Sequence, residues 1–148
     1  PVSGLELAGD AAAPGEPAEL RGIRVLLVDD QPAILELVQE ILTAAGATVQ
    51  LSGSAPEALE LVRSWRPDVL VSDIAMPEHD GYWLIAAVRA LGPEEGGATP
   101  AVALTAYVRA AERERGLAAG YQIFVPKPVE PAELRSAIAA VVRQAALD

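Results

Sequence analysis

The chain has 148 residues, of which 51% are hydrophobic, carries a formal net charge of −10 and contains no cysteine. Its length suits one domain, and no apolar run approaches the ~20 residues that span a bilayer, so we expect a soluble, cytoplasmic protein without membrane insertion. The lack of cysteine excludes disulfides and thiolate metal sites, and the acidic balance argues against nucleic-acid binding.

Residues 1–20 differ from the rest of the chain in composition. They combine proline, glycine and alanine with four acids, and they contain no lysine or arginine. No helical or strand period persists in them, which is typical of a linker. We therefore expect a linker at 1–20 and one folded domain at 21–148.

Short apolar runs alternate with amphipathic segments from residue 21 onward. In chain order, the first half predicts a strand at 23–28, a helix from Pro32 to Gly46, a strand at 47–51, a helix from the capping box at 54–57 to Pro67, and a strand from 68 to Asp73. The second half predicts a helix with Leu84, Ile85, Val88 and Leu91, a loop at 92–99, a strand at 100–104, a helix at 109–119, a strand at 121–125, and a helix from Pro131 to about Ala145.

This alternation with short connections predicts a doubly wound α/β domain, in which a parallel sheet of five strands lies between two layers of helices. The carboxyl ends of the strands then meet at one edge, where open α/β sheets bind their ligands. The polar residues that follow these strands are Asp29, Asp30, Asp73, Thr105 and Lys127. The sequence therefore brings three carboxylates, a hydroxyl and an ammonium to one edge.

Such a cluster of acids needs a counter-charge. Even at an effective dielectric constant of ~20, two unit charges ~4 Å apart repel by about 4 kcal/mol. Lys127 balances one charge, and the oxygen ligands suit Mg²⁺, with Mn²⁺ and Ca²⁺ as alternatives. A cation and an ammonium beside one carboxylate suit phosphoryl transfer, in which that carboxylate is the nucleophile. The plainer reading, in which Asp73 only caps the next turn, does not explain why all five groups meet.

The motifs Val28-Asp29-Asp30, Asp73-Ile74-Ala75-Met76-Pro77, Leu104-Thr105-Ala106 and Val125-Pro126-Lys127-Pro128 resemble the receiver domain of bacterial response regulators, over about residues 22–146. The resemblance implies a flavodoxin-like sheet with strand order 2-1-3-4-5 and five helices. It also implies that a phosphohistidine of a histidine kinase or histidine phosphotransfer protein donates the phosphoryl group. The implied roles are phosphoacceptor for Asp73, Mg²⁺ binding for Asp29, Asp30, Asp73 and the Ala75 carbonyl, and contacts to phosphoryl oxygens for Lys127 and Thr105.

The same resemblance implies a conformational switch that couples Thr105 to Phe124, three residues before Lys127. The switch would move the face formed by the helix at 109–119, the strand at 121–125 and the last helix. The helix at 109–119 has few apolar residues, as expected of a mobile element. Simple core packing of Phe124 remains an alternative, because phenylalanine lacks a polar ring tip. Ala75 and Tyr107 resemble positions that govern water access to an aspartyl phosphate, but this pair predicts no clear lifetime.

Other functions fit the sequence less well. A phosphatase of the haloacid dehalogenase type would need a second aspartate two residues after the first, which Asp29-Asp30-Gln31 lacks, and no glycine-rich nucleotide loop is present. A receiver-like scaffold that works without phosphorylation stays open. The acidic linker and the sequences at 73–77 and 127–131 are similar to those of receivers at the carboxyl end of hybrid histidine kinases. A free single-domain regulator is the alternative parent. Whether the parent protein is an enzyme also stays open, although such a domain would catalyse its own phosphorylation and dephosphorylation.

Overall fold

The computed structural model describes residues 19–106 and 109–147. Its five strands form one parallel sheet in the order β2-β1-β3-β4-β5, which confirms the predicted fold class and strand order. The strands are β1 (Arg24–Val28), β2 (Thr48–Ser52), β3 (Val69–Asp73), β4 (Ala101–Thr105) and β5 (Ile123–Pro126).

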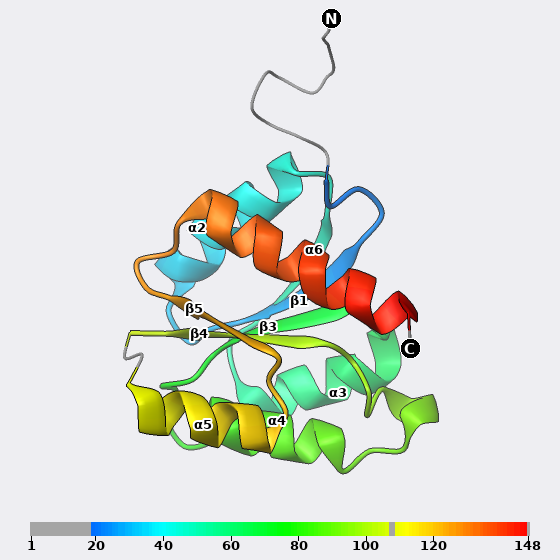
Figure 1. Ribbon diagram of the computed structural model, residues 1–148, viewed down its shortest axis with the longest axis vertical. Helices are drawn as coiled ribbons and strands as arrows, with labels where there is room; N and C mark the ends of the chain where they lie inside the picture. Colours follow the sequence, from blue (N-terminus) through cyan, green and yellow to red (C-terminus); the bar gives the residue numbers. More distant parts are fainter. Residues whose placement is uncertain (1–18, 107–108, 148) are drawn as a thin grey trace, which may run out of the picture.

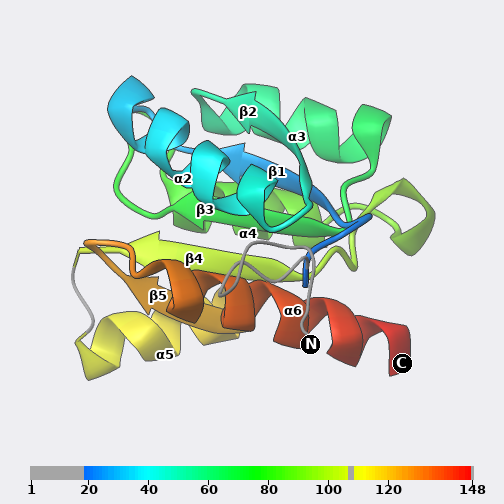
Figure 2. The ribbon, with the colours of Figure 1, turned by 90° about the horizontal axis from the view of Figure 1, so that it is seen from above.

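Helices cover both faces of the sheet (Figures 1 and 2). In the described part of the chain there are five α-helices: α2 (Pro32–Ala44), α3 (Ala55–Trp65), α4 (Gly81–Arg89), α5 (Ala110–Ala119) and α6 (Pro131–Leu147). The helices α2 and α6 pack on one face, and α3, α4 and α5 pack on the other. The loop predicted at 92–99 also contains a turn of 3-10 helix, η1 (Pro93–Glu95).

Alternation along the strands divides the apolar residues between two cores. In β1, Val25 and Leu27 join the core beneath α2 and α6, whereas Leu26 and Val28 join the core beneath α3 and α4. All four side chains are fully buried, as expected for a strand between two layers. This double burial explains why the inner strands β1, β3 and β4 are largely apolar without alternation.

Two helices begin at side-chain caps, of which the one at Ser54 was predicted from the sequence. The backbone N–H of Glu57 donates to the Ser54 hydroxyl, 3.4 Å away, at the start of α3. The capping box is only half formed, because the Glu57 carboxylate accepts from the hydroxyl of Ser52 and the N–H of Gly53 instead of the N–H of Ser54. At the start of α4, the N–H of Trp83 donates to the Asp80 carboxylate over 2.9 Å.

The packed unit begins earlier than the predicted boundary at residue 21. Leu20 is fully buried in the core beneath α2 and α6, and its N–H donates to the carbonyl of Ala45. Glu19 forms an ion pair of 3.1 Å with Arg135. Residues 19 and 20 therefore pack as part of the domain, because an apolar side chain at this position completes its core. The rest of the predicted linker, residues 1–18, lies outside the described residues.

Within residues 19–106 and 109–147, no helix has the length and apolar character needed to cross a membrane.

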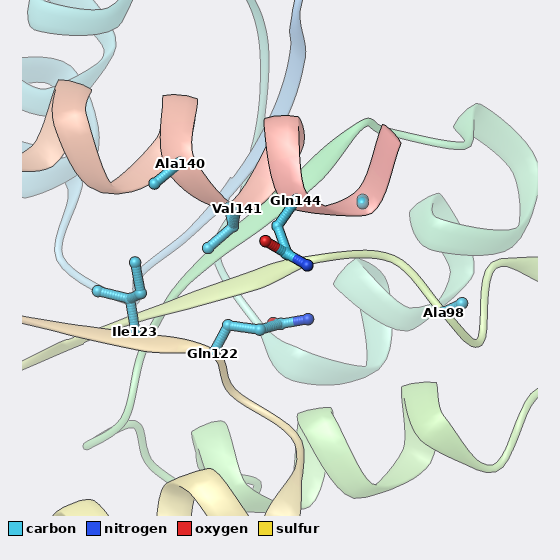
Figure 3. Close-up of a pocket in the computed structure, with 7 residues that line it drawn as sticks. Ala98, Gln122, Ile123, Ala140, Val141 and Gln144 are labelled. Atoms are coloured by element: carbon cyan, nitrogen blue, oxygen red, sulfur yellow. The ribbon is translucent and has the colours of Figure 1, made fainter. Parts of the chain in front are cut away.

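A pocket of about 310 Å³ lies between β5 and α6 (Figure 3). Small and apolar side chains and the two amides of Gln122 and Gln144 line it, and none of its lining residues is charged. The predicted site residues Asp29, Asp73 and Lys127 lie instead at the opposite edge of the sheet, where the strands have their carboxyl ends.

Candidate functional site

Three aspartates gather where β1 and β3 end. The carboxylates of Asp29, Asp30 and Asp73 each place an oxygen within 4.8 Å of the others. Asp29 and Asp73 are buried, and Asp30 is exposed. The two strands are neighbours in parallel register, with Val28 opposite Ser72, so the residues that follow them meet by topology. The structure thus brings together the acids that the strand-end pattern predicted.

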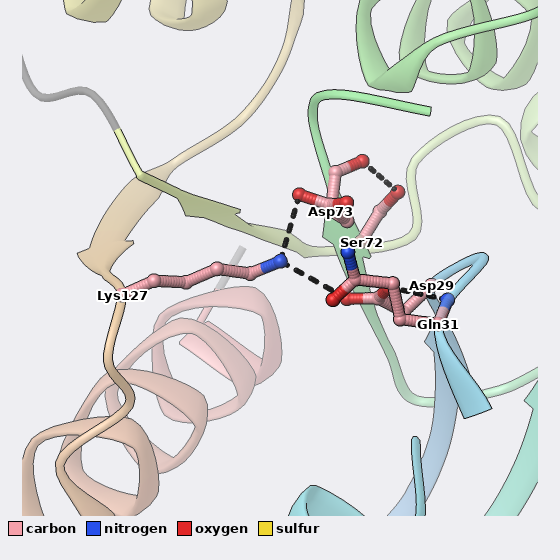
Figure 4. A network of polar contacts seen from close by, with 5 residues as sticks. All are labelled: Asp29, Gln31, Ser72, Asp73 and Lys127. Carbon is pink, nitrogen blue, oxygen red and sulfur yellow. Dashed lines mark hydrogen bonds and ion pairs between the residues drawn. The ribbon is translucent and has the colours of Figure 1, made fainter. Parts of the chain in front are cut away.

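Lys127 reaches this cluster from the end of β5 (Figure 4). Its ammonium lies 3.1 Å from Asp73 Oδ1 and 3.2 Å from Asp29 Oδ2. The lysine side chain is 18% exposed, so both ion pairs are largely shielded from water. Charge-assisted contacts of this length hold the ammonium between the two carboxylates.

Backbone contacts fix the groups around the acids. The N–H of Gln31 donates to Asp29 Oδ1 over 2.9 Å, and the Ser72 hydroxyl donates to the carbonyl of Asp73 over 2.9 Å (Figure 4). The N–H of Lys127 donates to the carbonyl of Thr105 over 2.8 Å, which joins the ends of β4 and β5. The Lys127–Pro128 peptide bond is cis.

Gly81 allows the loop after β3 to fold back on the site. A Cβ added at Gly81 would lie 2.6 Å from the carbonyl oxygen of Asp73 and 2.8 Å from Cα of Ile74. Its N–H donates to the Ile74 carbonyl over 2.8 Å. Only a residue without a side chain permits this approach, so Gly81 sets where α4 begins relative to Asp73.

The ionisation of Asp73 and Lys127 reflects this crowding. Burial, and then the charge of Asp29, raise the pKa of Asp73 above its usual value, and the ammonium of Lys127 does not fully offset them. Burial alone would lower the pKa of Lys127, but the charges of Asp73 and Asp29 outweigh it and raise that pKa. Lys127 therefore stays charged, whereas Asp73 lacks sufficient compensation for its negative charge.

A pocket of about 380 Å³ opens above Asp73. Its walls come from the ends of the four strands β1, β3, β4 and β5 and from the helices α4 and α5: Gln31, Asp73, Ile74, Ala75, Tyr82, Thr105, Ala106, Glu112 and Lys127. Asp73, Ala75, Thr105 and Lys127 were predicted from the sequence, and Thr105 is 7% exposed here. The pocket is large enough for a phosphoryl group with part of its donor.

The sequence pattern missed Tyr82 and Glu112 in the pocket wall. The Tyr82 hydroxyl donates to the carbonyl of Glu112 over 3.2 Å, and the guanidinium of Arg115 lies 3.9 Å from the centre of the Tyr82 ring. These contacts join the start of α4 to α5 beside the pocket. Tyr82 directly follows Gly81 at a helix start, which was the only available signal, and its side-chain direction depends on how α4 packs.

The two proposed switch residues lie on the same side of the sheet. Phe124 packs in the core beneath α3 and α4, with its ring 6.1 Å from that of Tyr121 in an edge-on arrangement. This position is compatible with both readings of Phe124, so its role in a switch stays a prediction. Tyr107, the expected partner of Ala75 in water access, lies outside the described residues.

The ligand set of the cluster fits Mg²⁺. The available donors are carboxylate oxygens within 4.8 Å of one another, and hard divalent cations prefer oxygen. The three aspartates and Lys127 together keep an excess of negative charge, which agrees with the raised pKa of Asp73. A divalent cation would relieve this excess.

With this geometry in place, comparison with known proteins identifies the family. The sequence-family model of the response regulator receiver domain matches residues 25–139. The chain belongs to this family. Receiver domains act in phosphorylation-based two-component signalling, and they bind Mg²⁺ in an acidic pocket of the kind described above.

Relatives of this receiver domain include proteins of different lengths. It is 44% identical over 110 residues to the uncharacterized 14.6 kDa protein in the sodA1 3′ region of Leptolyngbya boryana, which covers 74% of this chain and 82% of that protein. It is 37% identical over 126 residues to the response regulator MprA of Mycobacterium ulcerans, which covers 85% of this chain and 53% of MprA. The chain thus spans about half the length of the MprA relatives that it matches.

Solved receiver structures share the fold. The chemotaxis protein CheY4 of Vibrio cholerae superposes with a TM-score of 0.75 at 31% identity, over 80% of this chain and 98% of CheY4. The receiver domain of sensor histidine kinase PA1611 from Pseudomonas aeruginosa has a TM-score of 0.75 at 30% identity, over 82% of this chain and 98% of that chain. The PA1611 structure has a magnesium ion coordinated in its active site cleft.

Proposed function

We propose that this receiver domain accepts a phosphoryl group on Asp73 from a phosphohistidine of a histidine kinase or a histidine phosphotransfer protein. The supporting observation is the position of Asp73 at the end of β3, within 4.8 Å of two further carboxylates and 3.1 Å from the Lys127 ammonium. Asp73 also lines the pocket of about 380 Å³ at this edge of the sheet. Membership of the receiver family supports the same assignment.

In the proposed step, a carboxylate oxygen of Asp73 attacks phosphorus as the P–N bond to the imidazole breaks. The products are an acyl phosphate on Asp73 and a free histidine, whose nitrogen keeps the electron pair of the broken bond and then takes a proton. The Lys127 ammonium holds its proton throughout, because the pKa of this group is raised, and it binds a phosphoryl oxygen. Thr105, at the end of β4, would hydrogen-bond another phosphoryl oxygen.

Asp29, Asp30, Asp73 and the carbonyl of Ala75 would hold Mg²⁺, with Mn²⁺ as a substitute. When bound, the cation would neutralise charge on the phosphoryl oxygens. Gln31 N–H fixes the carboxylate of Asp29 for this purpose. Asp30 is exposed, so its carboxylate can adjust to an arriving ion at little cost.

Phosphorylation with a small donor tests the assignment. We expect the protein, incubated with Mg²⁺ and either acetyl phosphate or a phosphohistidine donor, to gain an acid-stable, base-labile phosphoryl group. Asp73→Asn should abolish this gain. Asp68→Asn is the matched control, because Asp68 precedes the same strand at the opposite edge, where it accepts from the N–H of Arg24. If the wild-type protein gains no phosphoryl group, or Asp73→Asn gains it equally, the proposal is wrong.

The parent protein is proposed to be a hybrid histidine kinase, with this domain at its carboxyl end. The similarity to the receiver domain of sensor histidine kinase PA1611 supports this architecture. The similarity to the chemotaxis protein CheY4, of which the match covers 98%, supports the alternative of a free single-domain regulator. The gene upstream of Pro1 separates the two: a kinase catalytic region there is expected, and a start codon there would contradict the hybrid.

A further inference from the structure

The loop between β3 and α4, residues 74–80, carries one of the proposed Mg²⁺ ligands, the carbonyl of Ala75. We call it the phosphoacceptor loop. The N–H of Gly81 donates to the carbonyl of Ile74 over 2.8 Å and so closes this loop at its base. Within the loop, Glu78 has a φ of 68°, in the left-handed region that residues other than glycine rarely adopt. Such a backbone keeps its conformation only where the surrounding structure fixes it.

Two buried hydroxyl groups hold the carbonyls on either side of the phosphoacceptor loop. The Ser72 hydroxyl donates to the carbonyl of Asp73 over 2.9 Å, directly before the loop. The Tyr121 hydroxyl donates to the carbonyl of Gly81 over 2.8 Å, directly after it. Burial raises the pKa of Tyr121 well above its usual value, and the hydrogen bond with Ser72 offsets only part of this rise. The Tyr121 hydroxyl therefore keeps its proton and acts as a donor.

Tyr121 reaches the loop from a distant part of the chain. It precedes β5, whereas Gly81 begins α4, and β4 lies between β3 and β5 in the sheet. The residues that β4 contributes to the core around Tyr121 are Ala101 and Ala103, whose small side chains leave room for the ring. Tyr121 is 2% exposed, so the core fixes its position independently of the loop that it holds.

We propose that Tyr121 is a positioning residue for the Mg²⁺ site, whose hydroxyl, together with that of Ser72, fixes the ends of the phosphoacceptor loop and thereby the Ala75 carbonyl. This inference rests on the proposed function and deepens it. With both ends held, the carbonyl is in place before an ion arrives. Without the Tyr121 hydroxyl, the loop has to be ordered when the ion binds, and this cost reduces the affinity.

Tyr121→Phe removes the hydroxyl and keeps the ring. We expect the dissociation constant of Mg²⁺, measured by isothermal titration calorimetry, to rise by about tenfold. The rate of phosphorylation by acetyl phosphate at saturating Mg²⁺ should stay within about twofold of the wild type, because the loop is ordered once the ion is bound. A purely structural role would leave the dissociation constant unchanged.

Thr99→Val is the matched control. The Thr99 hydroxyl is also buried and also donates to a backbone carbonyl, that of Gly96, over 2.7 Å. It lies in the loop before β4, at the edge of the sheet opposite the proposed Mg²⁺ site. Its removal should lower the melting temperature and leave the dissociation constant of Mg²⁺ unchanged.

Amide hydrogen exchange tests the loop without any ion. In EDTA, the Gly81 N–H reports on the bond to Ile74 that closes the loop, and amides of β1 and β3 report on global unfolding. Relative to those strands, we expect the Gly81 amide to exchange about tenfold faster in Tyr121→Phe and at the wild-type rate in Thr99→Val. Ser72→Ala should raise the exchange rate and the dissociation constant in the same direction, and it carries the test if Tyr121→Phe does not fold.

The outcomes separate this inference from the function on which it rests. If the wild type binds no Mg²⁺, the proposed metal site fails, and this inference fails with it. If the wild type binds Mg²⁺, but Tyr121→Phe and Ser72→Ala bind it equally tightly, only the inference is wrong. A similar loss of affinity in Thr99→Val would trace the effect to general destabilisation and would also overturn the inference.

Discussion

Lys127 faces two carboxylates, and at the scale of single residues this imbalance explains the behaviour of the site. Its ammonium lies 3.1 and 3.2 Å from Asp73 and Asp29. A third acid, Asp30, approaches them to within 4.8 Å. One ammonium compensates only part of this charge, so the site is poised for a cation and for the oxygens of a phosphoryl group. The uncompensated negative charge of the site thus favours binding of a cation before any ligand is present.

Removal of the ammonium should destabilise the fold. Lys127→Met keeps the stem of the side chain and leaves the buried carboxylate of Asp29 without its ion pair. We expect the free energy of unfolding, measured with urea in the presence of EDTA, to fall by about 3 kcal/mol. Addition of Mg²⁺ should raise the melting temperature more in the variant than in the wild type. An equal effect of Mg²⁺ on both proteins would argue against a cation site beside Lys127.

Asp73 should have the opposite effect on stability. Its pKa is raised, so the folded protein binds the proton more tightly than the unfolded chain does, and ionisation of Asp73 destabilises the fold. Without divalent cations, Asp73→Asn should therefore unfold at a higher temperature than the wild type at pH 7. The difference should shrink as the pH falls from the raised pKa toward the ordinary value of 3.8. A variant that is less stable at pH 7 would contradict this sign.

At the scale of elements, α4 and α5 have contrasting attachments. The helix α4 buries Leu84, Ile85 and Val88 and has a side-chain cap at its start. The helix α5 buries only Gly116 and has no side-chain cap at Arg109. We therefore expect stability to be uneven along the chain, with α5 held less firmly than α4.

The cap of α4 can be tested by substitution. Asp80→Ala removes the acceptor for the N–H of Trp83 and should lower the free energy of unfolding by about 1 kcal/mol. Asp80→Asn is the matched control, because an asparagine side chain caps about as well. Denaturation in urea gives both values. Equal losses in the two variants would mean that the charge of Asp80, and not its capping bond, is responsible.

At the scale of the whole molecule, Arg89 joins segments that are distant in sequence. From the last turn of α4, its guanidinium donates to the carbonyls of Gly97, Thr99 and Gly120, at 3.0, 2.6 and 2.7 Å. It thereby links the loop before β4 to the turn between α5 and β5. Burial lowers the pKa of Arg89, which is tolerated because these carbonyls satisfy its donors.

Arg89→Met should weaken the whole domain. The change keeps an apolar stem but leaves the Thr99 and Gly120 carbonyls without their donor, so we expect the free energy of unfolding to fall by about 3 kcal/mol. Arg63→Met is the control, because Arg63 is 48% exposed and its ion pair with Glu60 is 3.6 Å long. The control should change the free energy of unfolding by less than about 0.5 kcal/mol. Similar losses in both variants would contradict a linking role for Arg89.

Part of the site was predictable from the sequence for a specific reason. Asp29 and Lys127 each follow a strand and Asp73 ends one, and the direction of a parallel strand fixes the edge at which its last residue lies. Tyr82 and Glu112 were missed because both lie on helices, and the rotation of a helix about its axis depends on packing. Leu20 was missed because one apolar residue carries no weight in a segment that was assessed by its average composition.

The order of the elements, the parallel sheet and the polar residues at its edge were predictable because they follow from local periodicity and chain direction. The contacts that complete the site depend on the tertiary structure. It placed Lys127 between two carboxylates, brought Tyr82 to the pocket and pressed the Phe124 ring against Gly116. These contacts join residues far apart in sequence, and their geometry depends on how whole helices pack on the sheet, which no local pattern encodes.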